Sequence, residues 1–206
     1  MLGAVMLGGW VFDINALKNF APGAVRMKVN TAAGLLLSGI VLGLLLRRTT
    51  AKKIWIVTAT ASILIFIVGA MTLCENMFSW DLRIDQILFH DSTGAESSLE
   101  PGRMSPSSAI CFLFVGVAFF VASQSWWARP RIPIISAVAM VIISIGAMAL
   151  AGHFTGALLS VRWWHYAGMA VPTAAGFIML GFGLLAMLHR EAGLTWWLDN
   201  SPPVDM

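Results

Sequence analysis

The sequence has 206 residues, of which 58% are hydrophobic and only 11% are charged, and its mean hydropathy is +0.81. A soluble domain carries roughly 25% charged residues and needs polar cover on its exposed face, so this composition excludes a water-soluble fold. The net charge of +3 does not indicate nucleic-acid binding. The basic residues lie beside hydrophobic runs, where they act as signals of membrane topology.

Six apolar segments follow one another along the chain. They are roughly Leu2–Phe12, Thr31–Leu46, Ile54–Cys74, Ser107–Ser123, Ile134–Ala151 and Ala170–Leu188. A membrane span needs about 20 mostly apolar residues, and every segment except the first meets this need with help from its flanks. The sequence therefore predicts an all-α integral membrane protein, a six-helix transmembrane bundle whose first partner is the lipid bilayer.

The first segment is too short to cross a bilayer by itself. Either its upstream half is absent from this chain, so that the first helix is truncated, or the helix continues through Asp13 towards Phe20 at the membrane surface. We favour the first of these two alternatives.

Basic residues give the orientation of the spans. The short links after the second and fourth segments carry Arg47, Arg48, Lys52, Lys53, Arg129 and Arg131. The positive-inside rule places these links and both termini in the cytoplasm. We expect a multi-pass protein of the bacterial inner membrane.

An internal repeat is the most specific feature of the sequence. Three segments align without gaps on the pattern Met-x-x-x-[Ser/Thr]-Ala, and each continues into an apolar helix with a glycine at the same offset. The motifs begin at Met27, Met104 and Met169, and the glycines are Gly39, Gly116 and Gly181. The pattern predicts a single transmembrane domain over residues 1–206. It consists of three repeated helical hairpins, approximately 1–47, 53–124 and 133–189, and a cytoplasmic tail, 190–206.

The motif residues have a structural interpretation. Asn30, Ser105 with Pro106, and Pro172 are start signals for helices that descend from the outer face. The hydroxyl of the motif can bond back to its own helix, and the alanine and glycines let neighbouring helices approach closely. Packing and capping therefore explain most of the repeat, and a direct role in ligand binding is the alternative.

Two copies of the motif also carry a resemblance. Glu-Pro-Gly-Arg-Met-Ser-Pro-Ser-Ser-Ala, from Glu100 to Ala109, and Gly-Met-Ala-Val-Pro-Thr-Ala, from Gly168 to Ala174, resemble a family of bacterial membrane sensor regions. These regions stand at the N-termini of histidine kinases and diguanylate cyclases, and their pattern reads P-G-R-M-S-P-x-T-A, then M-A-L-H-T-A. Pro172 replaces the histidine, and Ser108 stands where threonine is usual. The resemblance covers nearly the whole chain and implies a sensory input module of signal transduction.

The sequence carries no catalytic motif, so we expect no enzymatic activity and no cofactor. An outer-face Cu(I) site at His153 and His165 is an alternative, but methionines beside them in apolar helices usually only pack, and we expect no metal. Cys74 and Cys111 each lie within an apolar segment, and we expect both to be free, buried thiols.

Polar residues and the repeated motif converge at the outer ends of the helices. The residues that we expect to bind a small ligand of unknown identity are Glu75, Arg103, Met104, Ser108, His153 and Met169. Glu75 ends an apolar span, where a charge is costly. Its carboxylate either reaches water or pairs with Arg103 at the entrance of an outward-facing pocket.

Four functions compete on this sequence, of which a membrane enzyme ranks last. A sensory input module leads, a small polytopic subunit of a larger membrane complex follows, and a transporter is third, because few polar groups lie at mid-span. The sequence does not distinguish between a homodimer and a larger membrane complex as the assembled state.

The predicted topology is tested by thiol labelling of Ser98→Cys, which lies in the longest outer loop. A membrane-impermeant maleimide should label this variant from the periplasmic side, because the positive-inside rule places the loop there. Labelling from the cytoplasmic side alone would reverse the orientation.

Overall fold

The computed structural model describes residues 2–12, 27–47, 51–78, 80, 103–124, 131–155 and 168–200, with the side chains of the last helix described as far as Glu191. In these residues the chain forms six helices and no strand. The helices are α1 (Leu2–Val11), α3 (Val29–Leu46), α4 (Lys52–Phe78), α5 (Pro106–Ser123), α6 (Arg131–Thr155) and α8 (Val171–Asn200). The prediction of an all-helical protein is confirmed for this part of the chain.

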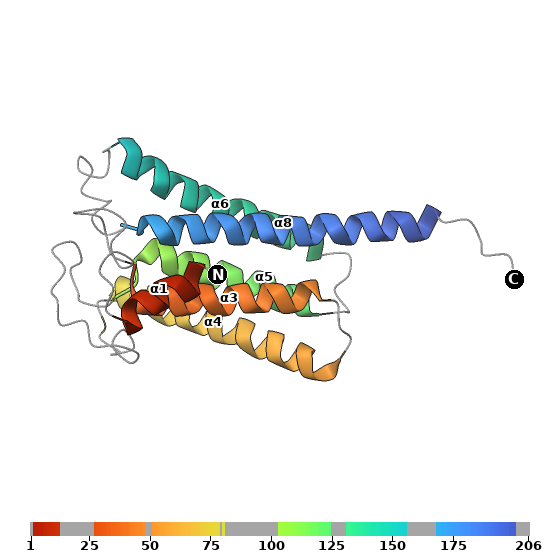
Figure 1. The fold of residues 1–206 in the computed structure, drawn as a ribbon, viewed down its shortest axis with the longest axis horizontal. Coiled ribbons are helices and arrows are strands. Elements are labelled where there is room, and N and C mark those ends of the chain that lie inside the picture. The colour runs from red at the N-terminus through yellow and green to blue at the C-terminus, as the bar shows by residue number, and fades with distance from the viewer. Residues whose placement is uncertain are drawn as a thin grey trace, which may run out of the picture.

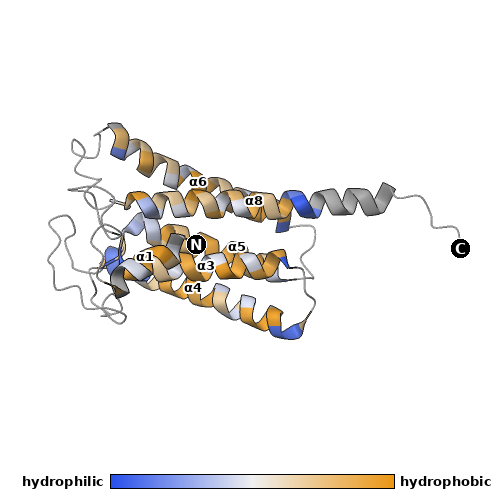
Figure 2. Ribbon diagram, in the orientation of Figure 1, coloured by the Kyte–Doolittle hydropathy of each residue, from blue (hydrophilic) through white to orange (hydrophobic). Residues whose placement is uncertain are grey.

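Five of these helices are long and apolar enough to cross a membrane, and α1, with ten residues, is not among them. Figure 2 shows that hydrophobic residues dominate the helices and that hydrophilic ones gather towards the two ends of the bundle. A multi-pass membrane protein is therefore supported by length and composition. The alternative course of the first helix, from Asp13 to Phe20, lies outside the described residues.

The last helix is longer than the sequence indicated. The apolar segment ends at Leu188, whereas α8 continues without a break to Asn200. Its thirty residues correspond to about 45 Å at a rise of 1.5 Å per residue. Figure 1 shows that α8 extends well past the ends of the neighbouring helices.

All three predicted helix starts can be compared with the structure. Pro172 lies in the first turn of α8, which begins at Val171, as expected. Ser105 is the N-cap of α5, its side chain accepts a hydrogen bond from Ser108 N at 3.3 Å, and Pro106 follows as the first helical residue. The prediction for Asn30 is wrong. α3 begins one residue earlier, at Val29, because the extended Lys28 already supplies the first helical acceptor.

The alanine of each motif begins the helix ladder in the same register. Its N–H donates to the carbonyl oxygen four residues earlier, which belongs to the residue after the motif methionine. The bonds run from Ala32 N to Lys28 O, from Ala109 N to Ser105 O and from Ala174 N to Ala170 O, each at 3.0 Å. The three helices therefore start identically relative to the motif.

Three helix pairs pack closely along the chain: α1 with α3, α4 with α5, and α6 with α8. In each pair a glycine of the first helix rests on the motif alanine of the second. A Cβ built on Gly3, Gly69 or Gly146 would lie 2.8, 2.8 and 2.9 Å from the carbonyl oxygens of Ala32, Ala109 and Ala174. Backbones that approach this closely leave no room for a side chain at these glycines.

The second helices of the three pairs meet in the core. The rings of Phe112 in α5 and Phe177 in α8 lie edge to face with centroids 4.9 Å apart. Phe112 also packs over Gly34, and Leu35 of α3 packs over Gly176 of α8. Leu35, Phe112 and Phe177 each stand three residues after their motif alanine and are all buried.

The close helix contacts give a test with a matched control. A Cβ at Gly116 would lie 2.7 Å from the backbone nitrogen of Phe66, whereas one at Gly39 would meet nothing within 4 Å. We expect Gly116→Ala to lower the free energy of unfolding by about 1–3 kcal/mol, because the overpacked helices must separate. Gly39→Ala should be neutral. Thermal unfolding in detergent measures both, and equal stability of the two variants would contradict the packing described.

Candidate functional site

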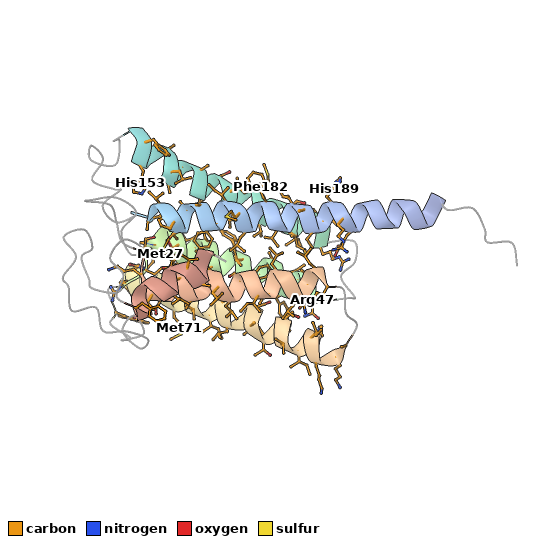
Figure 3. The ribbon with its side chains drawn as sticks, in the orientation of Figure 1. Met27, Arg47, Met71, His153, Phe182 and His189 are labelled. Atoms are coloured by element: carbon orange, nitrogen blue, oxygen red, sulfur yellow. The ribbon has the colours of Figure 1, made fainter. Side chains whose placement is uncertain are left out.

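The three motif methionines lie at one end of the bundle, which we call the motif end, defined by Met27, Met104 and Met169. Their side chains are 1%, 1% and 2% exposed. Figure 3 shows Met27 and His153 at this end, and Arg47 and His189 at the opposite one. We call the opposite end the basic end, defined by Arg47, Lys52, Arg131 and Arg190.

In the α4–α5 and α6–α8 pairs, a side chain of the first helix bonds to the motif segment. His153 Nε2, near the end of α6, lies 2.8 Å from the carbonyl oxygen of Met169. Asn76 Nδ2, near the end of α4, donates to the carbonyl oxygen of Met104 at 3.4 Å and to that of Thr72 at 2.8 Å. Each bond ties the end of one helix to the segment that begins the next.

The motif hydroxyls are buried. Thr31, Ser108 and Thr173 are each 2% exposed. Ser108 Oγ lies 2.8 Å from Ser105 Oγ, so the cap of α5 and the motif serine share a hydrogen bond. This contact joins the motif serine to the cap residue of α5.

Glu75 is fully buried at the motif end, with 0% of its surface exposed. The interpretation that its carboxylate reaches water is therefore wrong. The aligned positions in the other two pairs are Gly9 and Gly152, which are also buried. The α4–α5 pair thus holds a carboxylate within the bundle where the other pairs hold no side chain at all.

Arg103 is partly exposed, and its Nη2 donates to the carbonyl oxygen of Trp80 at 3.0 Å. This bond links the entry to α5 with the residues that follow α4. The pairing of Arg103 with Glu75 stays a prediction. The structure nevertheless brings all six predicted residues to the motif end.

Sequence reasoning missed two polar residues of this end. Lys28 follows a motif methionine and is only 8% exposed, although lysine side chains are rarely buried. Asn76 occupies the position that aligns with His153, and that alignment was the available signal. The motif end therefore combines a buried carboxylate, a buried lysine and three side-chain bonds to backbone carbonyl oxygens, from Asn76, Arg103 and His153.

The described residues contain no group of three or more His, Cys, Asp or Glu side chains that could hold a metal ion. His165, the second histidine of the alternative copper site, lies outside them. Cys74 and Cys111 are both free thiols, as expected from the sequence. Cys111 is buried, but Cys74 is exposed, so the expectation that both are buried is wrong for Cys74.

The His153 bond provides a stability test. We expect His153→Leu to lower the free energy of unfolding by about 1–3 kcal/mol, because the carbonyl oxygen of Met169 would lose its partner in a largely buried setting. His153→Asn introduces the residue type that the α4–α5 pair has at the aligned position, Asn76. An asparagine amide can also donate to the carbonyl oxygen of Met169, so this variant should retain more of the stability. Thermal unfolding of both variants in detergent measures the difference, and equal losses would show that the bond contributes nothing.

No protein-family model matches this chain, and neither a curated protein nor a solved structure does. The resemblance to bacterial sensor regions accordingly rests on the motif residues, and it stays a prediction.

Proposed function

We propose that this chain is the membrane-embedded sensory input module of a bacterial signal-transduction protein in the inner membrane. In this proposal three repeated hairpins form the bundle, both termini face the cytoplasm, and the motif end faces outward. A small ligand or another stimulus acts at the motif end. The module itself catalyses no reaction.

The observation that carries the proposal is the continuity of α8. This helix begins two residues after the buried Met169, whose carbonyl oxygen bonds to His153, and it runs unbroken to Asn200. It therefore connects the motif end mechanically to a point beyond the basic end (Figure 1). A transmembrane sensor needs such a connection, because its input and output lie on opposite sides of the bilayer.

The repeated contacts favour three equivalent hairpins. Each pair has the same glycine-on-alanine crossing, the same first hydrogen bond after the motif and the same buried core position. If three like hairpins pack around one centre, a displacement of one hairpin changes its packing contacts with the other two. The proposal places the methionines at equivalent depths on this basis.

The polar residues within the spans argue against transport. Ser38, Ser62 and Ser144 donate to the carbonyl oxygens of Gly34, Thr58 and Met140, four residues earlier, at 2.7, 2.6 and 2.8 Å. Such bonds satisfy a hydroxyl inside its own helix. Transport sites usually present polar groups or broken helices to a path at mid-depth, and these hydroxyls are already occupied.

The motif end supplies what a ligand would need to change. A stimulus shifts a protein only by binding its two arrangements unequally. Glu75 and Lys28 are buried here, and a polar ligand that reached them would offer each a new partner. Such a ligand would also compete with or reinforce the bond between His153 and the carbonyl oxygen of Met169.

A reporter fusion tests this function. The chain is joined after α8 to a diguanylate cyclase, and the cellular cyclic-dinucleotide level is measured for the parent, Glu75→Gln and Arg103→Ala. We expect at least one variant to change the output by about fivefold or more, the lower range of coupling between sites. Lys52→Gln, at the exposed start of α4, is the control and should leave the output unchanged.

If both variants insert normally and signal as the parent does, the site at the motif end is wrong. Membrane insertion is checked by the amount of full-length protein in the membrane fraction.

A further inference from the structure

Two adjacent residues of α8 contact other helices where α8 leaves the bundle. Nη1 of Arg190 donates to the carbonyl oxygen of Leu46, the last residue of α3, at 3.4 Å. The carboxylate of Glu191 lies 3.0 Å from Nη2 of Arg131, the first residue of α6. At the basic end α8 is therefore joined both to α3 and to α6.

The ion pair with α6 is largely removed from water. The side chains of Arg131 and Glu191 are 24% and 22% exposed. Opposite charges that are partly buried attract each other more strongly than charges on an open surface, and salt screens them less. This pair is therefore placed to hold α8 against α6 at the point where α8 emerges.

The guanidinium group of Arg131 is only half used by this ion pair. Nε and Nη2 of an arginine point to the same side, where they can bind both oxygens of one carboxylate. Nη2 binds Oε2 of Glu191, whereas the buried Nε has no hydrogen-bond partner in the described part of the chain. A buried N–H group without a partner is costly. The second oxygen of the same carboxylate would satisfy it, if the carboxylate moved towards Nε.

The same two helices are also joined at the motif end. Nε2 of His153, in α6, lies 2.8 Å from the carbonyl oxygen of Met169, just before α8. Between the two ends, a Cβ at Gly146 of α6 or Gly181 of α8 would lie 2.9 and 3.0 Å from a backbone carbonyl oxygen of the other helix. Packed helices move past each other by small sliding displacements. A displacement of α8 at the motif end would therefore change the ion pair at the basic end.

We propose that Arg131 and Glu191 form a two-position clasp that sets where α8 leaves the bundle. In the first position, which the structure shows, Nη2 alone binds the carboxylate. In the second, a displacement of α8 relative to α6 brings the carboxylate onto Nε and Nη2 together. Both groups stay charged in both positions, and no proton is transferred.

The use of the clasp in signalling rests on the proposed function, whereas the two positions themselves do not. A stimulus at the motif end would change the balance between the positions by binding one arrangement of the bundle more tightly than the other. Because α8 continues unbroken to Asn200, the displaced helix would carry this difference out of the bundle.

Distances between spin labels test the clasp in the full chain, held in bilayer nanodiscs. The labels are attached at Ile132→Cys in α6 and His189→Cys in α8, which are exposed positions close to the clasp, after Cys74→Ser and Cys111→Ala. Pulsed electron paramagnetic resonance should give two distances between the labels. With Arg131→Lys it should give one, because an ammonium group keeps the ion pair but lacks the planar fork.

Three further variants separate the clasp from charge alone. Lys53→Gln removes one positive charge from an exposed residue of α4 at the same end and should leave both distances in place. Glu191→Gln keeps the size of the side chain but loses the ion pair, so a single broad distribution should replace the two distances. His153→Leu should change the proportion of the two distances about fivefold or more, the lower range of coupling between sites.

The clasp is overturned if the parent shows a single distance, if Arg131→Lys retains both, or if Glu191→Gln matches the parent. The reporter fusion then measures Arg131→Lys, whose output should differ from that of the parent about fivefold or more. If Glu75→Gln or Arg103→Ala changes the output and Arg131→Lys does not, the role of the clasp in signalling is wrong. If two distances are found and none of these variants changes the output, the sensory function is wrong and the clasp stands.

Discussion

The bundle depends on the crossing of a glycine over an alanine carbonyl in each of its three helix pairs. In a bilayer the hydrophobic effect does not draw helices together, because lipid tails are as apolar as the side chains. Close van der Waals packing must replace it, and backbones pack most closely where one helix has no side chain. Gly3, Gly69 and Gly146 provide that closeness. The core residues Phe112 and Phe177 stand three residues after the alanines of two of these crossings.

The spans could be predicted because hydropathy alone determines them. The predicted ends lie within a few residues of α3, α4, α5 and α6, and five helices have the length and composition of spans. The start of α5 was also predictable, since Ser105 and Pro106 form a local capping signal that needs no partner. The start of α3 was not, because Asn30 resembles a cap while the backbone of Lys28 performs that function.

The motif end was predicted in composition but not in detail. Hydropathy assigns Glu75 to water because charges are costly in a span, yet it is fully buried where helices converge. The importance of Asn76 depends on a bond across to the entry of α5, which only the fold reveals. The length of α8 was missed for a different reason. A helix that leaves the membrane no longer needs apolar residues. The apolar segment therefore ends at Leu188, whereas the helix itself continues to Asn200.

The unbroken course of α8 relates the directions in which its two ends face. A hydrogen-bonded helix resists twisting about its own axis, so the azimuth of α8 at the basic end determines its azimuth at Asn200. Each residue of an α-helix advances about 100° around the axis, and two adjacent residues fix the phase at the basic end. Arg190 reaches Leu46 of α3, and Glu191 reaches Arg131 of α6. Together these two contacts fix the direction in which the side chains of α8 face at the basic end. If a further segment continued α8 as one helix, the direction in which each of its residues faces would depend on how many residues separate it from Arg190 and Glu191.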